Sequence, residues 1–388
     1  MTMSTRPAEL VNSRLDRLAR PTLRLGRRSR PAYAVCGAGG VVAGVSLAVG
    51  LSAARNLSLP VMATVAAAAV ASLPALALAR KLVSGEEQLV QYHHQAAVLL
   101  VAVGTLWVLR KPVLVYLDPT LVGLALCLGL GRIGCLLVGC CYGRPCRLGV
   151  RYSEQQGRIG FPTYLIGVRL FPVQALEAGW LLVIAGVGSA LLLTGARPGE
   201  AAAWFVLAYS GGRFAFEFLR GDVERPIYAG FSEAHWTALL VSSALVIAEL
   251  TQHAAVARRH AALPALLVAA MACTALVRRV RAVPRDRLLS PAHIRDIAQA
   301  VDSLAGQARN EDIEIRRTAM GVRISRGDGN PGSHYTISSD DGAMSIGTAR
   351  VLASLLLRLD DHAGPGRLLP AGGGVFHVLA GPTTGRTR

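Results

Sequence analysis

Apolar residues in this chain fall into long runs that short polar or arginine-containing segments separate. Runs that approach the roughly 20 apolar residues needed to cross a bilayer predict spanning helices near residues 32–54, 57–79, 95–109, 113–131, 173–194, 200–219, 234–251 and 261–277. The third and the last of these runs are short, so the pattern predicts seven or eight transmembrane helices. The expected fold of this part is an all-α polytopic membrane bundle.

The pattern changes after Val283, where a polar stretch opens and no later run is long enough to span. The tail shows helical periodicity near 291–308 and 347–360, and strand-like pieces at Ile313–Ile315 and Val322–Ser325, then a turn and another short strand. These features predict a small α+β soluble domain. The chain therefore divides into a basic N-terminal segment (1–30), a transmembrane domain (31–280) and a soluble C-terminal domain (281–388).

Composition supports a membrane protein over an ordinary soluble one. Hydrophobic residues make up 52% of the chain and charged residues 17%, and the mean hydropathy is +0.41. The net charge of +17 comes largely from arginines at the termini and in loops, not from one clustered basic face. We therefore expect contact with anionic lipid at the membrane surface and no nucleic acid partner.

A first candidate site follows the run at 113–131. Arg132 lies there between Gly131 and Gly134, and Gly143 follows at the end of the same segment. Burying an arginine at a helix centre in lipid costs about 2.5 to 3.5 kcal/mol, so it should face the bundle or a polar cavity. Its guanidinium group suits a phosphate, which it can hold through two parallel hydrogen bonds. A snorkelling arginine at a helix end is the competing interpretation.

A second candidate site lies in the run at 200–219. Tyr209, Arg213 and Glu217 are four residues apart and share one face of a helix, and Arg220 lies on nearly the same face. Ionisable residues inside a membrane usually mark functional sites. A buried Arg–Glu pair that fixes helix packing is the alternative.

Two further features contain side chains that could take part in a reaction. His94, at the start of the third run, can act as a general base at neutral pH, although it can equally be an interfacial residue. Four of the seven cysteines crowd into a short segment: Cys135, Cys140, Cys141 and Cys146. Thiolates are strong ligands for zinc and for iron–sulfur clusters, but the spacing here is not that of the common CxxC pair. A metal is therefore the weaker interpretation, and we expect no metal and no cofactor. A local disulfide, small packing residues, or relay thiols at Cys135 and Cys140 remain open.

Three segments together resemble the prolipoprotein diacylglyceryl transferase family. They are "GRIGCLLVGCCYGRP", "FPVQALEA" and "YSGGRFAFEFLRGD", in the order of the family and within roughly residues 80–250. The resemblance implies an all-helical membrane bundle in the cytoplasmic (inner) membrane of a bacterium. It also implies transfer of a diacylglyceryl group from phosphatidylglycerol, or a related anionic phospholipid, to the lipobox cysteine of a prolipoprotein, with glycerol phosphate as the leaving group.

By position, the resemblance places Arg132 and Arg213 at the phosphate. It also implies catalytic roles for Tyr209 and Glu217, and it places the remaining predicted binding residues at the phosphate or lipid: Arg220, Gly131, Gly134, Gly143 and Gln174. Glu177 also falls on the middle segment. The chain departs from the family pattern at Cys135 and Val138, which replace asparagines, and at Cys140, which replaces an acidic residue. His94 is the nearest match to the histidine of a His-Gly-Gly turn. The chain thus keeps the two arginines that would hold the phosphate better than it keeps the family's acid–base groups. The identity of the acceptor is therefore open.

Three hypotheses follow. In the first, Arg132 and Arg213 neutralise the phosphate leaving group while a base such as His94 activates the attacking thiol. In the second, the acceptor is not a protein and a cysteine relays the lipid. In the third, the arginines form a structural network in a phospholipid-binding protein without turnover.

Orientation is open between two arrangements. The family-like arrangement places the N-terminus and the arginine site outside the cell. The eight arginines before residue 31 favour the cytoplasm for the same face. We take the family-like arrangement as the expectation.

Overall fold

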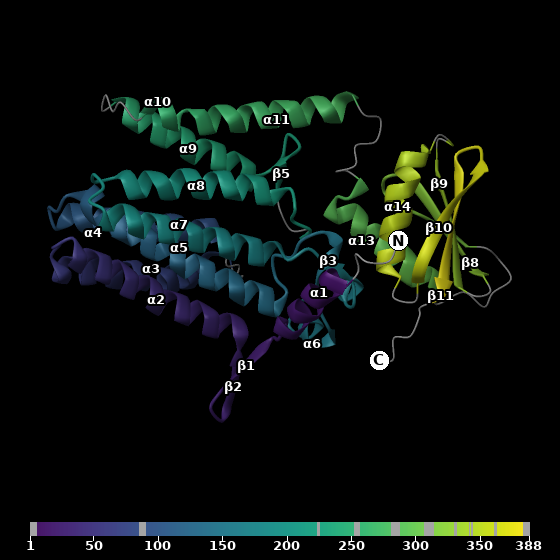
Figure 1. Ribbon diagram of the computed structural model, residues 1–388, viewed down its shortest axis with the longest axis horizontal. Helices are drawn as coiled ribbons and strands as arrows, with labels where there is room; N and C mark the ends of the chain where they lie inside the picture. Colours follow the sequence, from purple (N-terminus) through teal and green to yellow (C-terminus); the bar gives the residue numbers. More distant parts are fainter. Residues whose placement is uncertain are drawn as a thin grey trace.

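The computed structural model describes residues 6–84, 91–222, 226–251, 257–280, 288–305, 314–329, 332–340, 342, 344–360 and 363–382. It shows a bundle of long helices joined at one end to a smaller domain in which helices cover a sheet (Figure 1). The helices of the bundle are α2 (Ala32–Ala54), α3 (Leu59–Ser84), α4 (Gln91–Val108), α5 (Val113–Val138), α7 (Val173–Leu193), α8 (Glu200–Glu217), α9 (Glu233–Thr251), α10 (Ala257–His260) and α11 (Ala262–Val280).

Six of the described helices are long and apolar enough to cross a membrane: α2, α3, α5, α7, α9 and α11. Helix α4 contains a shorter apolar segment, Gln95–Val108. Helix α8 has 18 residues but carries Glu200, Arg213 and Glu217, which lower its hydropathy. A multi-pass helical bundle is confirmed, whereas a count of seven or eight spans stays a prediction.

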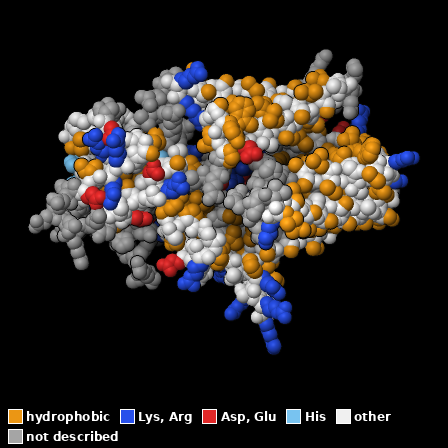
Figure 2. Space-filling view, turned by 180° about the vertical axis from the view of Figure 1, so that it is seen from behind, with side chains coloured by type: hydrophobic (Ala, Val, Ile, Leu, Met, Phe, Trp, Pro, Cys, Tyr) orange, Lys and Arg blue, Asp and Glu red, His pale blue; other side chains and the backbone are white. Residues whose placement is uncertain are grey.

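Apolar side chains dominate the surface of the bundle, and charged side chains gather on the smaller domain (Figure 2). This distribution is the one expected when lipid surrounds the helices and water surrounds the C-terminal part.

Helix α2 packs closely against α5 because glycines face each other where the two helices meet. A Cβ atom added to Gly44 would lie 2.5 Å from the carbonyl oxygen of Gly123, and one added to Gly40 would lie 2.8 Å from that of Cys127. Small residues at a helix crossing in lipid let the backbones approach and gain van der Waals contact. This contact fixes the helix that carries Arg132.

Short elements cover the end of the bundle where α5 ends. They are α1 (Arg6–Leu18), β1 (Thr22–Leu25), β2 (Arg28–Pro31), β3 (Pro145–Arg151), α6 (Glu154–Gly157), the 3-10 helix η1 (Thr163–Leu165), β4 (Arg169–Leu170), β5 (Ile227–Tyr228) and β6 (Phe231–Ser232). Strands β3 and β4 pair antiparallel. Helix α1 is fixed to this region because Asp16 accepts hydrogen bonds from the Arg151 backbone at 2.9 Å and from the Arg169 guanidinium at 2.9 and 3.1 Å.

The C-terminal domain is an antiparallel five-stranded sheet in the order β10-β11-β9-β8-β7, with two helices packed against it (Figure 1). Its elements are α13 (Pro291–Ala305), β7 (Ile315–Arg317), β8 (Val322–Gly329), β9 (Gly332–Ser339), α14 (Ile346–Leu359), β10 (Ala363–Gly372) and β11 (Val375–Pro382). The observed helices and β7–β9 agree with the predicted α+β pattern. Strands β10 and β11 were not predicted from the sequence.

The C-terminal domain packs against the loop region that follows α5. Leu136 and Tyr142 belong to the same hydrophobic cluster as Ile297 and Leu356 of the domain. The Arg358 guanidinium donates a hydrogen bond of 2.7 Å to the carbonyl oxygen of Pro145 at the start of β3. The domain thus lies directly against the segment that contains the cysteines.

The glycine contact between α2 and α5 is testable with two variants of the same helix. In Gly44→Ala the new methyl group meets the backbone of α5, so we expect overpacking to destabilise the protein by about 1 to 3 kcal/mol. In Gly37→Ala no atom lies within 4 Å of the added Cβ, and the higher helix propensity of alanine should leave stability unchanged or slightly higher. The measurement is thermal unfolding in detergent micelles; equal midpoints for both variants would contradict the packing argument.

Candidate functional site

The carboxylate of Glu177 joins two arginines that come from different helices. Glu177 lies in the first turns of α7, Arg132 near the end of α5, and Arg213 in α8. The Arg132 Nε atom lies 2.7 Å from Glu177 Oε2, and the Arg213 Nη1 atom lies 3.0 Å from Glu177 Oε1. All three side chains are buried, with exposed fractions of 4%, 4% and 9%. The first and second signature segments therefore meet at one acidic residue of the middle segment.

Two further ion pairs extend this network. Arg213 Nη1 also lies 2.9 Å from Glu217 Oε2, one helical turn farther along α8. Arg220, just after α8, forms a two-pronged pair with Asp222 at 2.8 and 2.7 Å, and its Nη1 atom lies 3.9 Å from Glu177. The predicted stripe on α8 thus places Arg213 and Glu217 in contact. Three arginines face three carboxylates, which offsets the cost of burying the charges.

A small cavity opens at this network and is lined by Arg132, Glu177, Trp180, Leu181, Tyr209, Arg213 and Phe216. Tyr209 therefore shares a wall with both arginines. Its hydroxyl oxygen accepts a hydrogen bond of 3.0 Å from the side-chain amide of Gln95 in α4. The first turns of α4 consequently lie beside the cavity.

Helix α8 is held in place by a buried aspartate of α5. Asp118 accepts hydrogen bonds from the backbone N–H groups of Gly199 at 2.7 Å and Ala202 at 2.8 Å. These N–H groups at a helix N-terminus have no partner within their own helix, so a carboxylate there stabilises the helix start. Farther along, the Trp180 indole donates to the Ala208 carbonyl at 2.8 Å and ties α7 to α8. Arg213 is thereby fixed opposite Glu177.

The loops that follow α5 and α8 pair through their backbones. Arg144 N–H donates to the Leu219 carbonyl at 3.0 Å, and Gly221 N–H donates to the Tyr142 carbonyl at 2.9 Å. Gly143 lies between these bonds, and a Cβ atom added to it would lie 3.1 Å from the Leu219 carbonyl oxygen. The two signature segments, far apart in sequence, thus form one structural unit.

The other predicted binding residues occupy different surroundings. A Cβ atom on Gly131 would meet nothing within 4 Å, whereas one on Gly134 would lie 3.0 Å from the Cβ atom of Cys36 in α2. The Gln174 amide donates to the Cys140 carbonyl at 2.8 Å. Gly134 and Gly143 therefore serve close packing, Gly131 faces open space and Gln174 orders the cysteine loop; their contact with a substrate stays a prediction.

Three of the predicted cysteines come together beside the arginines. The sulfur atoms of Cys135, Cys140 and Cys141 all lie within 4.8 Å of one another, and could hold a metal ion. Outside the membrane span, the pKa of the Cys141 thiol lies well below its ordinary value, because Cys135 and Cys140 hydrogen-bond to it and Arg220 and Arg132 favour its negative charge. Cys141 was not among the predicted relay thiols; the relay roles of Cys135 and Cys140 stay predictions.

His94 lies in the first turn of α4, but its side chain is outside the described residues. Its role as a base stays a prediction. Sequence reasoning placed Glu177 on the middle segment but not among the site residues. The available signal was an acidic residue inside an otherwise apolar run, which in a membrane helix usually faces a partner.

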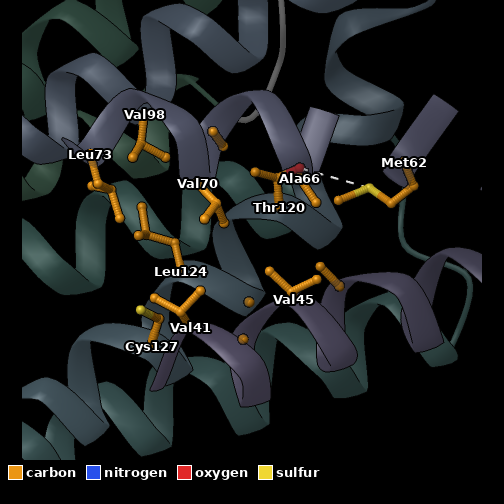
Figure 3. A pocket seen from close by; sticks show the side chains of 14 residues that line it. Val41, Val45, Met62, Ala66, Val70, Leu73, Val98, Thr120, Leu124 and Cys127 are labelled. Atoms are coloured by element: carbon orange, nitrogen blue, oxygen red, sulfur yellow. Dashed lines mark hydrogen bonds between the residues drawn. The ribbon is translucent and has the colours of Figure 1, made fainter. Parts of the chain in front are cut away.

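A second cavity lies between α2, α3, α4 and α5 and is apolar (Figure 3). Val41, Val45, Val70, Leu73 and Leu124 point into it, and no residue that lines it is charged. The Thr120 hydroxyl at its edge donates to the Tyr116 carbonyl of its own helix at 2.7 Å. Such a cavity offers no partner to a phosphate, so the arginine cavity is the better candidate site for an anion.

Comparison with known proteins agrees with the signature segments. The sequence model of the prolipoprotein diacylglyceryl transferase family matches residues 93–251. A phosphatidylglycerol–prolipoprotein diacylglyceryl transferase 2 of Clostridium perfringens (strain 13 / Type A) is 38% identical over 113 residues, which are 27% of this chain and 40% of the relative. A phosphatidylglycerol–prolipoprotein diacylglyceryl transferase of Clostridium tetani (strain Massachusetts / E88) is 34% identical over 112 residues, 28% of this chain and 43% of the relative. The chain thus spans less than half the length of these curated relatives.

The central position of Glu177 predicts a large effect of removing its charge. Glu177→Gln keeps the shape of the side chain but leaves the buried Arg132 without its carboxylate, so we expect a loss of about 3 to 5 kcal/mol in the free energy of unfolding. Glu154→Gln makes the same charge change at an exposed residue of α6 and should cost little. Thermal unfolding in detergent micelles measures the stability of both variants. An unchanged unfolding midpoint for Glu177→Gln would show that the buried arginines do not need the charge of Glu177.

Proposed function

We propose that this chain, whose residues 93–251 match the sequence model of the prolipoprotein diacylglyceryl transferase family, transfers a diacylglyceryl group from phosphatidylglycerol to the thiol of a lipobox cysteine. The observation that carries the proposal is the meeting of Arg132 and Arg213 at Glu177 in a buried cavity. The printed names of the two Clostridium relatives supply the substrates.

The reaction is a displacement at a saturated carbon. The thiolate sulfur attacks the glyceryl carbon of the lipid, and the carbon–oxygen bond to the phosphate breaks. Glycerol phosphate leaves with one more negative charge than the phosphodiester group carried. Fixed positive charges that meet this developing charge lower the barrier, and alignment of the thiol with the scissile bond contributes further.

Arg132 and Arg213 suit this task because each guanidinium has five N–H donors in a planar fork. Glu177 keeps both groups ionised and aimed at the same cavity, and Arg220 stands 3.9 Å from the same carboxylate. We assign Glu177, Glu217 and Asp222 to positioning the arginines. Tyr209 completes the wall of the cavity, where its hydroxyl can orient a phosphate or glycerol oxygen.

The proton of the acceptor thiol needs a base. His94 is the candidate, supported by the contact between its neighbour Gln95 and Tyr209. This contact brings the start of α4 to the side of the arginine cavity.

The resemblance to the same family supports a location in the membrane. We propose a multi-pass protein of the cytoplasmic membrane of a bacterium, with the arginine site at the outer face. We also propose that the chain consists of a basic N-terminal segment (1–30), a transmembrane domain (31–280) and a soluble C-terminal domain (281–388). Its partners are then phosphatidylglycerol or a related anionic phospholipid and a prolipoprotein.

A second candidate function has one supporting observation. The clustering of Cys135 and Cys140 within 4.8 Å beside the arginines favours a covalent relay that passes the lipid to a non-protein acceptor. A lipid adduct trapped on either cysteine would support the relay over direct transfer.

The test is complementation in a bacterium depleted of its own transferase. We expect the wild-type gene to restore lipid labelling and the mobility shift of a reporter prolipoprotein. Arg132→Ala and Arg213→Ala should each lower transfer by roughly a hundredfold or more, since removal of one charge-stabilising donor costs about 10²–10³ in rate. Arg158→Ala, at an exposed position on the same end of the bundle, is the control and should restore labelling.

Full activity of either buried-arginine variant would contradict the proposal. Failure of a well-expressed, membrane-inserted wild-type protein would favour another acceptor or a phospholipid-binding protein without turnover.

A further inference from the structure

The three clustered cysteines come from a chain reversal at the end of α5. Helix α5 ends at Val138, and Gly139 has a left-handed backbone with φ of 88° whose N–H donates to the Cys135 carbonyl. Cys141 is also left-handed, with φ of 55°. A non-glycine residue in this region is strained by an amount of order 1 to 3 kcal/mol, and such strain is common at functional sites. The two reversals bring Cys140 and Cys141 back over Cys135.

The loop is held in this conformation from outside. The Gln174 amide of α7 donates to the Cys140 carbonyl at 2.8 Å. A Cβ atom on Gly139 would lie 3.0 Å from the ring of Phe161 and 3.1 Å from that of Tyr152. The three sulfur atoms are thus placed by packing and hydrogen bonds from other elements, as the ligands of a metal site must be.

The spacing of the sulfur atoms suits a soft metal ion. Zinc binds thiolates at about 2.3 Å in a tetrahedron, which puts the sulfur atoms roughly 3.8 Å apart. The present limit of 4.8 Å is within about an ångström of this arrangement. Three protein ligands with an open fourth position are the pattern of catalytic zinc sites, whereas structural sites use four.

The surroundings favour a site that is open on one side. Cys135 is buried, Cys141 is half-buried and Cys140 is exposed, so the cluster can be approached past Cys140. Arg132 and Arg220 interact electrostatically with Cys141 and offset the negative charge that three thiolates and one Zn²⁺ carry together. Arg132 also belongs to the proposed phosphate site, so a metal here would adjoin the leaving group.

We propose that Cys135, Cys140 and Cys141 bind one Zn²⁺ ion whose open fourth position takes the thiol of the acceptor. This inference rests on the proposed function for the identity of the acceptor. A thiol that coordinates zinc is deprotonated at neutral pH. The cysteines thereby take over the activation of the thiol, in the segment where asparagine and an acidic residue of the family are replaced.

The step balances without a redox partner. The acceptor thiol gives its proton to a base or to water when its sulfur binds Zn²⁺. The sulfur then attacks the glyceryl carbon, a sulfur–carbon bond forms, and the carbon–oxygen bond to the phosphate breaks with its electron pair leaving on glycerol phosphate. The resulting thioether is a weaker ligand than a thiolate and leaves the metal, which keeps its charge throughout.

The first experiment measures the metal on the full-length protein in mild detergent. After loading with Zn²⁺ and gel filtration, we expect about one zinc per chain by elemental analysis. Loading with Co²⁺ should give thiolate-to-metal charge-transfer absorption in the near ultraviolet. Cys135→Ser, Cys140→Ser and Cys141→Ser should each weaken binding by roughly tenfold or more, whereas Cys146→Ser, the neighbouring cysteine outside the cluster, should bind as the wild type does.

A wild-type protein that retains no zinc and shows no charge-transfer band would overturn the proposal without any variant. A disulfide between two of the three cysteines in protein purified without added oxidant would overturn it as well.

The second experiment tests the open position with peptides. Adding a lipobox peptide that contains cysteine to the Co²⁺ protein should increase the charge-transfer absorption by roughly a third, as a fourth thiolate joins three. The same peptide with serine should not. An unchanged spectrum with the cysteine peptide would overturn the acceptor role of the metal.

Activity separates this proposal from the function on which it rests. Lipid transfer that continues in chelator-treated, metal-free protein would overturn the zinc site as a thiol activator and leave the transferase function standing. An increase in charge-transfer absorption with the cysteine peptide, but no lipid transfer, would support the metal site and contradict the proposed function.

Discussion

The bridge from Glu177 to Arg132 and Arg213 is the interaction on which the rest of the candidate site depends. Each partner comes from a different helix, and each is almost fully buried. An isolated charge in such a place is expensive, so each of the three depends on its partners, with Glu217 as a second carboxylate for Arg213. The packing of α5, α7 and α8 is therefore tied to the same charges that would hold a phosphate.

This dependence gives the contacts that support α5 and α8 their importance. Helix α5 is fixed by glycine contacts with α2, and α8 is fixed at its start by Asp118. Catalytic groups that must meet a developing charge gain most when they need not move to do so. In this protein α5 and α8 are held by contacts to backbone atoms: the glycine contacts with α2 and the hydrogen bonds to Asp118. Such contacts tolerate little variation in side-chain size.

Apolar runs and the four-residue spacing on α8 were enough to predict the helical bundle and the Arg213–Glu217 pair, since a helix places such residues on one face. The convergence at Glu177 was beyond sequence reasoning, because it depends on how three helices are rotated against each other. Strand β10 was missed because Ala363–Gly372 contains glycines and prolines, which are typical of loops. Strand β11, Val375–Pro382, was missed with it. The crowding of the cysteines was visible in the sequence, but which three would meet was not, because the left-handed conformations of Gly139 and Cys141 decide it.

The C-terminal domain has a direct physical route to the site. Its hydrophobic cluster includes Leu136, one residue after Cys135, and Arg358 holds the first carbonyl of β3. The segment from Cys135 to Pro145 therefore lies between the bundle and this domain, and Cys140 stays exposed at its surface. A domain that packs against the loop carrying the proposed ligands restricts the conformations of that loop, and a preorganised loop binds a metal ion with a smaller loss of entropy. By this argument the domain contributes to the site through the order of the loop.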